Sequence, residues 1–187
     1  GAYTSGYLWT NANPTEYGLA AIFSSHPNAE LVIKNNYLNS FVRILKENGY
    51  RTVFLRSANE KYNNEHIKLR QAGFGEIYGR DFFENNLDWG NYISGWGLED
   101  SYLYKYAIEF LKENHNNKLF LHLLPADTHS PYGRSHYFDG MDNYPKLSDN
   151  LSCVIDNRSL LSSFRREDFD ISVFYKNLLK ENLLDDE

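Results

Sequence analysis

The strongest constraint on the fold of this chain is the order of its periodic segments, in which helices alternate with short apolar strands. Apolar residues at helical spacing predict a helix over residues 37–48, which ends at an Asn-Gly stop, and the buried strand Arg51–Leu55 follows at once. A second helix is predicted over 60–72, closed by Gly73, and it leads into the apolar stretch 74–78. This alternation is typical of an α/β fold with a mostly parallel sheet and helices on both faces.

Four further segments complete the predicted fold. The most helical stretch, 98–114, is followed by the strand 118–124, and a last helix is predicted over 167–182. A short helix is predicted over Thr15–Ser24 near the start of the chain. At 187 residues, 42% of them hydrophobic, the chain has the size of one domain with a sizeable core. We therefore expect a single α/β domain over residues 1–187, with an unrelated flavodoxin-like domain as the alternative.

Charge and composition exclude several classes of protein. The net charge of −6, without a long basic block, disfavours nucleic-acid binding. The longest apolar runs, such as Leu119–Leu124, are far shorter than the roughly 20 residues of a membrane helix, so no span is expected within this chain. The single cysteine, Cys153, has no partner for an internal disulfide or a Cys-based zinc site. The 15 Tyr and 12 Phe are expected mainly in the core, and a sugar-binding surface is the alternative.

Two segments carry reactive side chains where an α/β sheet binds ligands. Thr15 opens a predicted helix, where free backbone N–H groups favour an anion; a plain helix cap is the alternative reading of this residue. The loop after the strand 118–124 carries His129 and Arg134. An imidazole there can bind or protonate an ester oxygen, and a guanidinium can clamp an oxyanion. A solvated or structural role is the alternative for His129.

The remaining histidines show no metal-ligand spacing, such as a pair one helical turn apart, and are predicted to be structural. They are His26, His66, His115 and His122.

The order and spacing of these segments resemble the sulfatase family of the alkaline phosphatase superfamily, and within it the lipoteichoic acid synthase and phosphoglycerol transferase branch. The resemblance covers most of the chain, and its fold implication is an alkaline-phosphatase-like sheet, present in part. The segments that carry it are the nucleophile segment Asn13–Ser25, the helix, Gly-Tyr and strand unit Leu45–Phe54, the Gly-Phe strand Ala72–Tyr78, the Trp-Gly helix start Trp96–Asp100 and the strand with its histidine Leu119–Tyr132. By this likeness Thr15 is the nucleophile and a metal ligand, and His129, with Arg134, holds the ester oxygens of the substrate.

The resemblance implies a metal-dependent phosphoester or sulfate ester hydrolase or transferase, which uses manganese, magnesium, zinc or calcium. Its other metal ligands would lie before Gly1 and after Glu187, so we expect a chain truncated at both ends that binds no metal and is inactive alone. Cys153 lacks the Cys-x-Pro-x-Arg context of sulfatases that use formylglycine, which favours a Thr nucleophile and phosphoryl chemistry.

The expected partner is a small molecule, glycan or lipid head group that bears phosphate or sulfate. The expected location is extracytoplasmic or in the secretory pathway, with any membrane anchor outside this chain. A catalytically inactive binding module for an anionic glycan or lipid head group is the alternative function.

Overall fold

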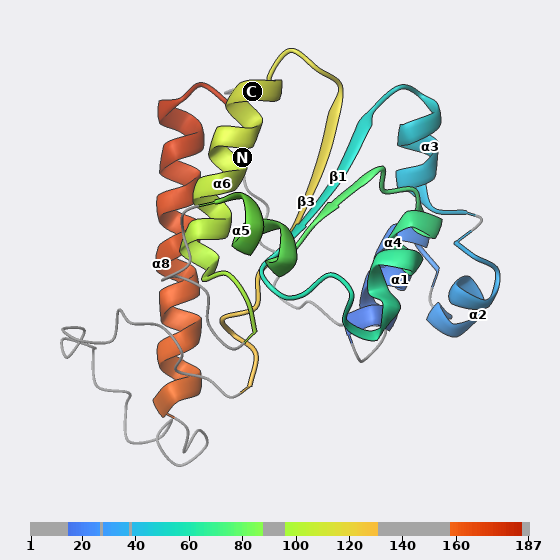
Figure 1. The fold of residues 1–187 in the computed structure, drawn as a ribbon, viewed down its shortest axis with the longest axis horizontal. Coiled ribbons are helices and arrows are strands. Elements are labelled where there is room, and N and C mark those ends of the chain that lie inside the picture. Colours follow the sequence, from blue (N-terminus) through green and yellow to red (C-terminus); the bar gives the residue numbers. More distant parts are fainter. Residues whose placement is uncertain (1–14, 27, 38, 88–95, 131–157, 185–187) are drawn as a thin grey trace.

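The structure is a computed structural model that describes residues 15–26, 28–37, 39–87, 96–130 and 158–184 (Figure 1). Helices and strands alternate along most of the described chain. In chain order the elements are α1 (Thr15–Ser24), α2 (Ala29–Lys34), α3 (Phe41–Glu47), β1 (Arg51–Arg56), the 3₁₀ turn η1 (Tyr62–Asn64), α4 (Glu65–Ala72), β2 (Glu76–Tyr78), α5 (Arg80–Asn86), α6 (Asp100–Asn114), β3 (Leu119–Leu124) and α8 (Arg158–Lys180).

The described strands form one parallel sheet in the order β2-β1-β3. β1 pairs with β3 along its whole length, from Arg51 opposite Leu119 to Arg56 opposite Leu124. Only the segment Val53–Leu55 of β1 pairs with the shorter β2. The central strand therefore ends, at Arg56, beside the point where β3 ends, and the loops that follow both strands leave the sheet at the same edge.

Helices cover both faces of the sheet, as Figure 1 shows: α1, α3 and α4 lie on one side, and α5, α6 and α8 on the other. Side chains of β1 alternate between the two cores, with Phe54 in the first and Val53 and Leu55 in the second. All three are fully buried. The α/β fold with a mostly parallel sheet and helices on both faces is therefore confirmed.

An aromatic cluster fills the core on the α1 side of the sheet. Phe23 of α1 lies edge-on to Phe74 and to His122, with ring centroids 5.1 and 5.2 Å apart. His122 also stacks on Phe54 at 4.9 Å. Burial lowers the pKa of His122 to about 4, so its imidazole is neutral at ordinary pH. Among the described residues, His122 has the structural role predicted for it, and most Tyr and Phe side chains lie in the two cores or pack against them, as predicted.

One predicted helix begins later than expected. The helix predicted over 60–72 is α4, which starts only at Glu65. Asn63 and Asn64 adopt left-handed backbone conformations, with φ of 53° and 57°, and a right-handed helix cannot run through them. The chain makes a turn of 3₁₀ helix there instead.

Other boundaries also differ. Neither α2 nor α5 was predicted; they have six and seven residues, too few for a periodic pattern to be distinctive. The last helix, predicted over 167–182, begins at Arg158 and packs along α6, where the rings of Tyr104 and Phe174 lie 5.0 Å apart. Within the described part of the chain no helix, α8 included, combines the length and the apolar character that crossing a bilayer requires.

Candidate functional site

A cavity of about 630 Å³ opens where β1 and β3 end. It is lined by the first turn of α1, by the loops that follow the two strands and by the segment before α6. Thr15 and His129, which lie far apart in the sequence, both line this cavity. The carboxyl end of a parallel sheet is where α/β proteins bind ligands. Arg134, the third residue predicted for the site, lies outside the described residues.

Thr15 is the first residue of α1, and it is exposed at the cavity wall. The adjacent Glu16 forms an ion pair of 2.7 Å with Lys68 of α4 and accepts a hydrogen bond of 3.2 Å from the side chain of Asn63. These contacts tie the first turn of α1 to the segment that carries η1 and α4. The free N–H groups of a helix start favour negative charge. The Thr15 hydroxyl therefore lies at the end of α1 that suits an anionic ester.

His129 lies in a turn shortly after β3. Its backbone N–H donates to the carbonyl oxygen of Ala126 at 2.9 Å. Its Nδ1 lies 2.7 Å from the carbonyl oxygen of Ser130, which can only accept, so Nδ1 carries the proton of this bond. This tautomer leaves Nε2 available as an acceptor in the neutral ring and as a second donor in the charged ring.

Two aromatic side chains stand beside His129 at the cavity. The Trp96 ring lies 4.5 Å from the imidazole of His129, and its Nε1–H donates to the carbonyl oxygen of Ser130 at 2.9 Å. Tyr62 meets Trp96 edge-on at 6.3 Å. Tyr62 and Trp96 both line the cavity, and we call the pair the aromatic wall. Aromatic faces of this kind can bind cations, and they can stack on the apolar faces of sugars.

Two arginines that line the cavity were not predicted from the sequence. Arg56 ends β1, is 7% exposed and pairs with Glu65 of α4. Burial lowers the pKa of Arg56 to about 10, which leaves the guanidinium charged at neutral pH. Arg80, the first residue of α5, pairs with Glu84 at 2.5 Å. The position of Arg56 directly after the predicted strand 51–55 was the signal that could have found it, because ligands bind at strand ends.

Two acidic side chains connect the loop after β3 to the start of α6. The carboxylate of the fully buried Asp100 accepts hydrogen bonds from the backbone N–H groups of Ala126 and Asp127, at 2.8 and 2.7 Å, and from the hydroxyl of Ser57. In return, Asp127 Oδ2 accepts from the backbone N–H of Asp100 at 3.0 Å. Burial raises the pKa of both carboxyl groups, and the negative charge of Glu167 adds to the effect on Asp100.

The described residues do not form a metal site by themselves. Among them no group of three or more His, Cys, Asp or Glu side chains is arranged to hold a metal ion. The Thr15 hydroxyl supplies one neutral oxygen, whereas divalent ions in proteins are held by several anionic or imidazole ligands. The donor set present in this part of the chain therefore does not fit a catalytic metal.

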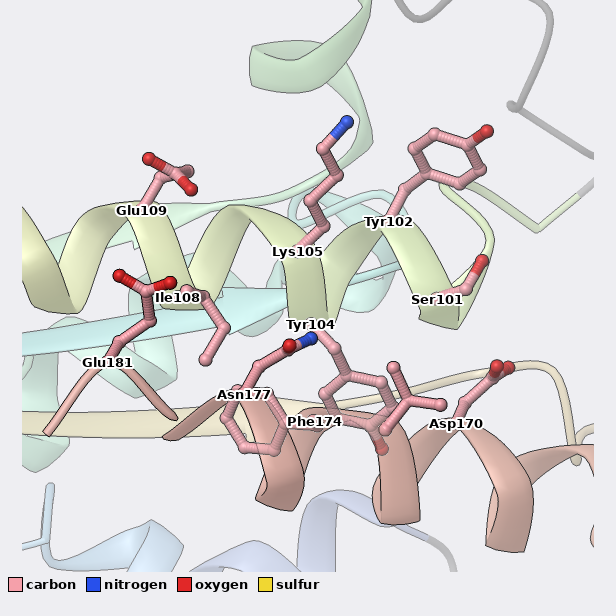
Figure 2. Close-up of a pocket in the computed structure, with 11 residues that line it drawn as sticks. Ser101, Tyr102, Tyr104, Lys105, Ile108, Glu109, Asp170, Phe174, Asn177 and Glu181 are labelled. Atoms are coloured by element: carbon pink, nitrogen blue, oxygen red, sulfur yellow. The ribbon is translucent and has the colours of Figure 1, made fainter. Parts of the chain in front are cut away.

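A second cavity, of about 390 Å³, lies between α6 and α8 (Figure 2). Tyr104 and Lys105 of α6 and Asp170 and Phe174 of α8 are among the residues that line it. In Figure 2 the side chains of Tyr104 and Ile108 point from α6 toward α8, whereas those of Tyr102 and Lys105 point away from it. Neither Thr15 nor His129 lines this second cavity, so the candidate site is the cavity at the strand ends.

Comparison of the sequence with known proteins gives a family and a set of relatives. The sequence profile of the Sulfatase family matches residues 3–180. Phosphoglycerol transferase I of Escherichia coli (strain 55989 / EAEC) is 27% identical over 110 residues, which cover 54% of this chain and 14% of that protein. The protein of the same name from Shigella boydii gives the same figures. The chain therefore spans a small part of the length of these relatives.

Solved structures show the same fold. The lipoteichoic acid synthase LtaP from Listeria monocytogenes superposes with a TM-score of 0.63 at 22% identity, over 79% of this chain and 34% of that one. A protein in the alkaline phosphatase superfamily from Vibrio parahaemolyticus superposes with a TM-score of 0.56 at 20% identity, over 75% and 31% of the two chains. With the profile match over nearly its whole length, the chain belongs to the Sulfatase family.

Proposed function

We propose that this chain carries the nucleophile and a substrate-binding histidine of an enzyme that transfers or hydrolyses a phosphoester, with Thr15 as the nucleophile and His129 as the binding residue. The observation that supports this most strongly is the shared cavity, because it brings together two residues that the sequence singled out independently. A sulfate ester is the alternative substrate. Similarity to proteins named phosphoglycerol transferase I favours phosphate.

The proposed reaction has two displacement steps. In the first, Thr15 Oγ gives its proton to solvent and attacks phosphorus, and the bond from phosphorus to the ester oxygen breaks. The departing alkoxide takes a proton from the imidazolium of His129, through Nε2. In the second step, water or the hydroxyl of an acceptor gives its proton to the neutral His129 and attacks the phosphorus of the phospho-threonine; the bond from phosphorus to Thr15 Oγ breaks, and Thr15 Oγ takes a proton from solvent. Water gives hydrolysis and an acceptor gives transfer.

Two arginines at the cavity can bind an anionic substrate, beside the acids Glu16 and Glu65 that also line it. The guanidinium groups of Arg56 and Arg80 line the same space as Thr15, and the start of α1 adds its free N–H groups. We propose that Arg134 adds a third guanidinium, as the family resemblance implies. These groups would bind the non-bridging oxygens of the ester and offset the charge that develops on them in the transition state.

The resemblance further suggests that a divalent metal (manganese, magnesium, zinc or calcium), with Thr15 among its ligands, acts in the complete natural protein. Such an ion would polarise the ester and acidify the nucleophile. The proposed substrate is a phosphate-bearing small molecule, glycan or lipid head group, met in an extracytoplasmic or secretory setting. This location follows the family resemblance.

The test of this function uses the complete natural protein with a nitrophenyl phosphate substrate. We expect Thr15→Ala to abolish turnover while circular dichroism shows an unchanged fold, and Thr15→Ser to retain part of the activity, because it keeps a hydroxyl. Intact mass spectrometry after a rapid quench should find an added phosphoryl group on the wild type and not on Thr15→Ala. Turnover that survives in Thr15→Ala would remove Thr15 from the mechanism.

The aromatic wall supports a second candidate, a catalytically inactive binding module for an anionic glycan or lipid head group. Trp96 and Tyr62 can stack on a sugar while Arg56 binds its anionic group. Calorimetry with glycerol phosphate and with a phosphorylated sugar separates the two functions. Binding that Trp96→Ala abolishes, in a wild-type protein that turns over neither ligand, would favour the binding module.

A further inference from the structure

We propose that Asp100 is a positioning residue for His129, and that it acts through hydrogen bonds that fix the loop 125–130 at the cavity. The Asp100 side chain accepts a hydrogen bond from the backbone N–H of Asp127, and the Asp127 side chain accepts one from the backbone N–H of Asp100. We call this reciprocal pair of hydrogen bonds the acid brace. The inference rests on the proposed function, because it assumes that His129 acts on the substrate. It assigns a role to a side chain that does not line the cavity.

The first component of the acid brace is an unusual helix cap. Glu99 occupies the N-cap position of α6, but its side chain makes no capping hydrogen bond. The backbone N–H of Asp100 is bonded instead to the carboxylate of Asp127, from the loop after β3. An unpaired N–H at a buried helix start would lower the stability of the fold. The hydrogen bond that avoids this cost also holds Asp127, and with it the loop after β3, against the start of α6.

The second component runs in the opposite direction. The Asp100 carboxylate accepts from the consecutive N–H groups of Ala126 and Asp127 and from the hydroxyl of Ser57. Ser57 directly follows β1 and is fully buried. One side chain therefore connects α6 to the loops after both strands that end at the cavity. Three hydrogen bonds to one fully buried carboxyl group hold these segments together.

The third component leads from the acid brace to the imidazole. The N–H of His129 is bonded to the carbonyl oxygen of Ala126, the residue whose own N–H is held by Asp100. The carbonyl oxygen of Ser130, which accepts from His129 Nδ1, also accepts from Trp96 Nε1–H. A shift of Ala126 would therefore move the base of the turn while Trp96 holds its far end, and the ring of His129 would rotate relative to Thr15.

The experiment combines amide exchange with a double-mutant cycle in the complete natural protein. The variants are Asp100→Asn, His129→Ala and the pair together, with Asp168→Asn, an exposed acid of α8, as the matched control. In Asp100→Asn we expect the amides of Ala126 and Asp127 to exchange at least about tenfold faster, the factor that corresponds to losing one charged hydrogen bond. We expect kcat to fall by about 100-fold with little change in KM, as for a misplacement of about 1 Å.

The double variant decides whether Asp100 acts through His129. If it does, Asp100→Asn causes no further loss in a protein that already carries His129→Ala, because the residue it positions is gone. Losses that multiply in the double variant would overturn the proposal, as would unchanged exchange at Ala126 and Asp127. A loss of stability alone would speed amide exchange throughout the chain, whereas the proposal expects the increase to be confined to the loop that holds Ala126 and Asp127.

The proposal stays testable if a variant fails to fold or leaves turnover unchanged. If Asp100→Asn does not fold, Ser57→Ala removes only one donor to the same carboxylate, and it should give smaller changes in the same direction; no change in exchange or kcat would overturn the proposal. If His129→Ala retains wild-type turnover, His129 has no part in the proposed function. The exchange rates at Ala126 and Asp127 then still support or overturn the acid brace by themselves.

Discussion

Replacement of Gly97 by alanine is the sharpest test of how the cavity is built. A Cβ at this position would lie 1.7 Å from the carbonyl oxygen of Ser57 and 2.9 Å from the Cα of Ala58. Ordinary contacts begin at 3.4 Å, and both neighbours are backbone atoms that cannot rotate away. The segment around Gly97 must therefore move by more than about 1 Å from the end of β1.

The cost follows from what this movement breaks. The segment is bound to the loop after β1 by the hydrogen bond of 2.9 Å from the N–H of Leu98 to the carbonyl oxygen of Ser57, and by a bridge between Gly97 and Ala58. Overpacking costs about 1–3 kcal/mol and a lost hydrogen bond about 1 kcal/mol, so Gly97→Ala should lower the free energy of unfolding by about 2–4 kcal/mol. Trp96 would move with the segment, away from His129.

Urea unfolding followed by circular dichroism measures this loss, and Gly75→Ala is the matched control. A Cβ at Gly75 would meet only the side chain of Thr52, at 3.6 Å, and the backbone there is not left-handed. We expect Gly75→Ala to be between unchanged and about 1 kcal/mol more stable than the wild type. Equal unfolding midpoints for the two variants would refute the close packing of Gly97 against Ser57.

Three other predictions follow from the core and the site. Phe23→Ala should lower the free energy of unfolding by about 3–5 kcal/mol in the same urea assay, whereas Ile22→Ala, at a side chain 58% exposed, should change it by less than about 0.5 kcal/mol. Burial lowers the pKa of His122 in the folded protein to about 4, below the unfolded value of about 6.5. The contribution of neutral His122 to stability is therefore complete above pH 6.5 or so and is lost as the pH falls toward about 4; unfolding curves of His122→Phe should lack this part of the pH dependence, and an unaltered profile would count against it. Calorimetry of the 187-residue chain with manganese, magnesium, zinc or calcium should show no tight stoichiometric binding, because Thr15 offers one hydroxyl; tight binding that Thr15→Ala abolishes would contradict this.

The order of elements could be predicted because its signals are local. Apolar periodicity marked α1, α6 and the strands, and Gly73 marked the end of α4. The start of α4 was wrong because the helix was extended through Asn63 and Asn64, although Asn adopts the left-handed conformation more readily than most residues. The helices α2 and α5 were not predicted because six or seven residues are too few to show a distinctive apolar period.

For the site, the sequence predicted the positions of Thr15 and His129 relative to their own elements, at a helix start and after a strand. It did not predict their neighbours. Arg56 and Trp96 reach the cavity only through the pairing of β1 with β3 and the close approach of Gly97 to Ser57, and both are tertiary contacts. Metal dependence and the role of Thr15 stay predictions that the proposed experiments address.

The first helix, α1, connects the core to the site, so a tilt at one end displaces the other. Phe23, in the middle of the aromatic cluster, and Thr15, at the cavity, are at opposite ends of α1. With a rise of about 1.5 Å per residue, Thr15 is roughly 12 Å from Phe23 along the axis, and a tilt of about 5° at Phe23 would swing Thr15 by roughly 1 Å. A displacement of that size can lower a reaction rate by about 100-fold. A change in ring size within the cluster would then displace Thr15, the proposed nucleophile, although the cluster is remote from the cavity. Substitutions that disturb the packing of this core would therefore lower activity as well as stability.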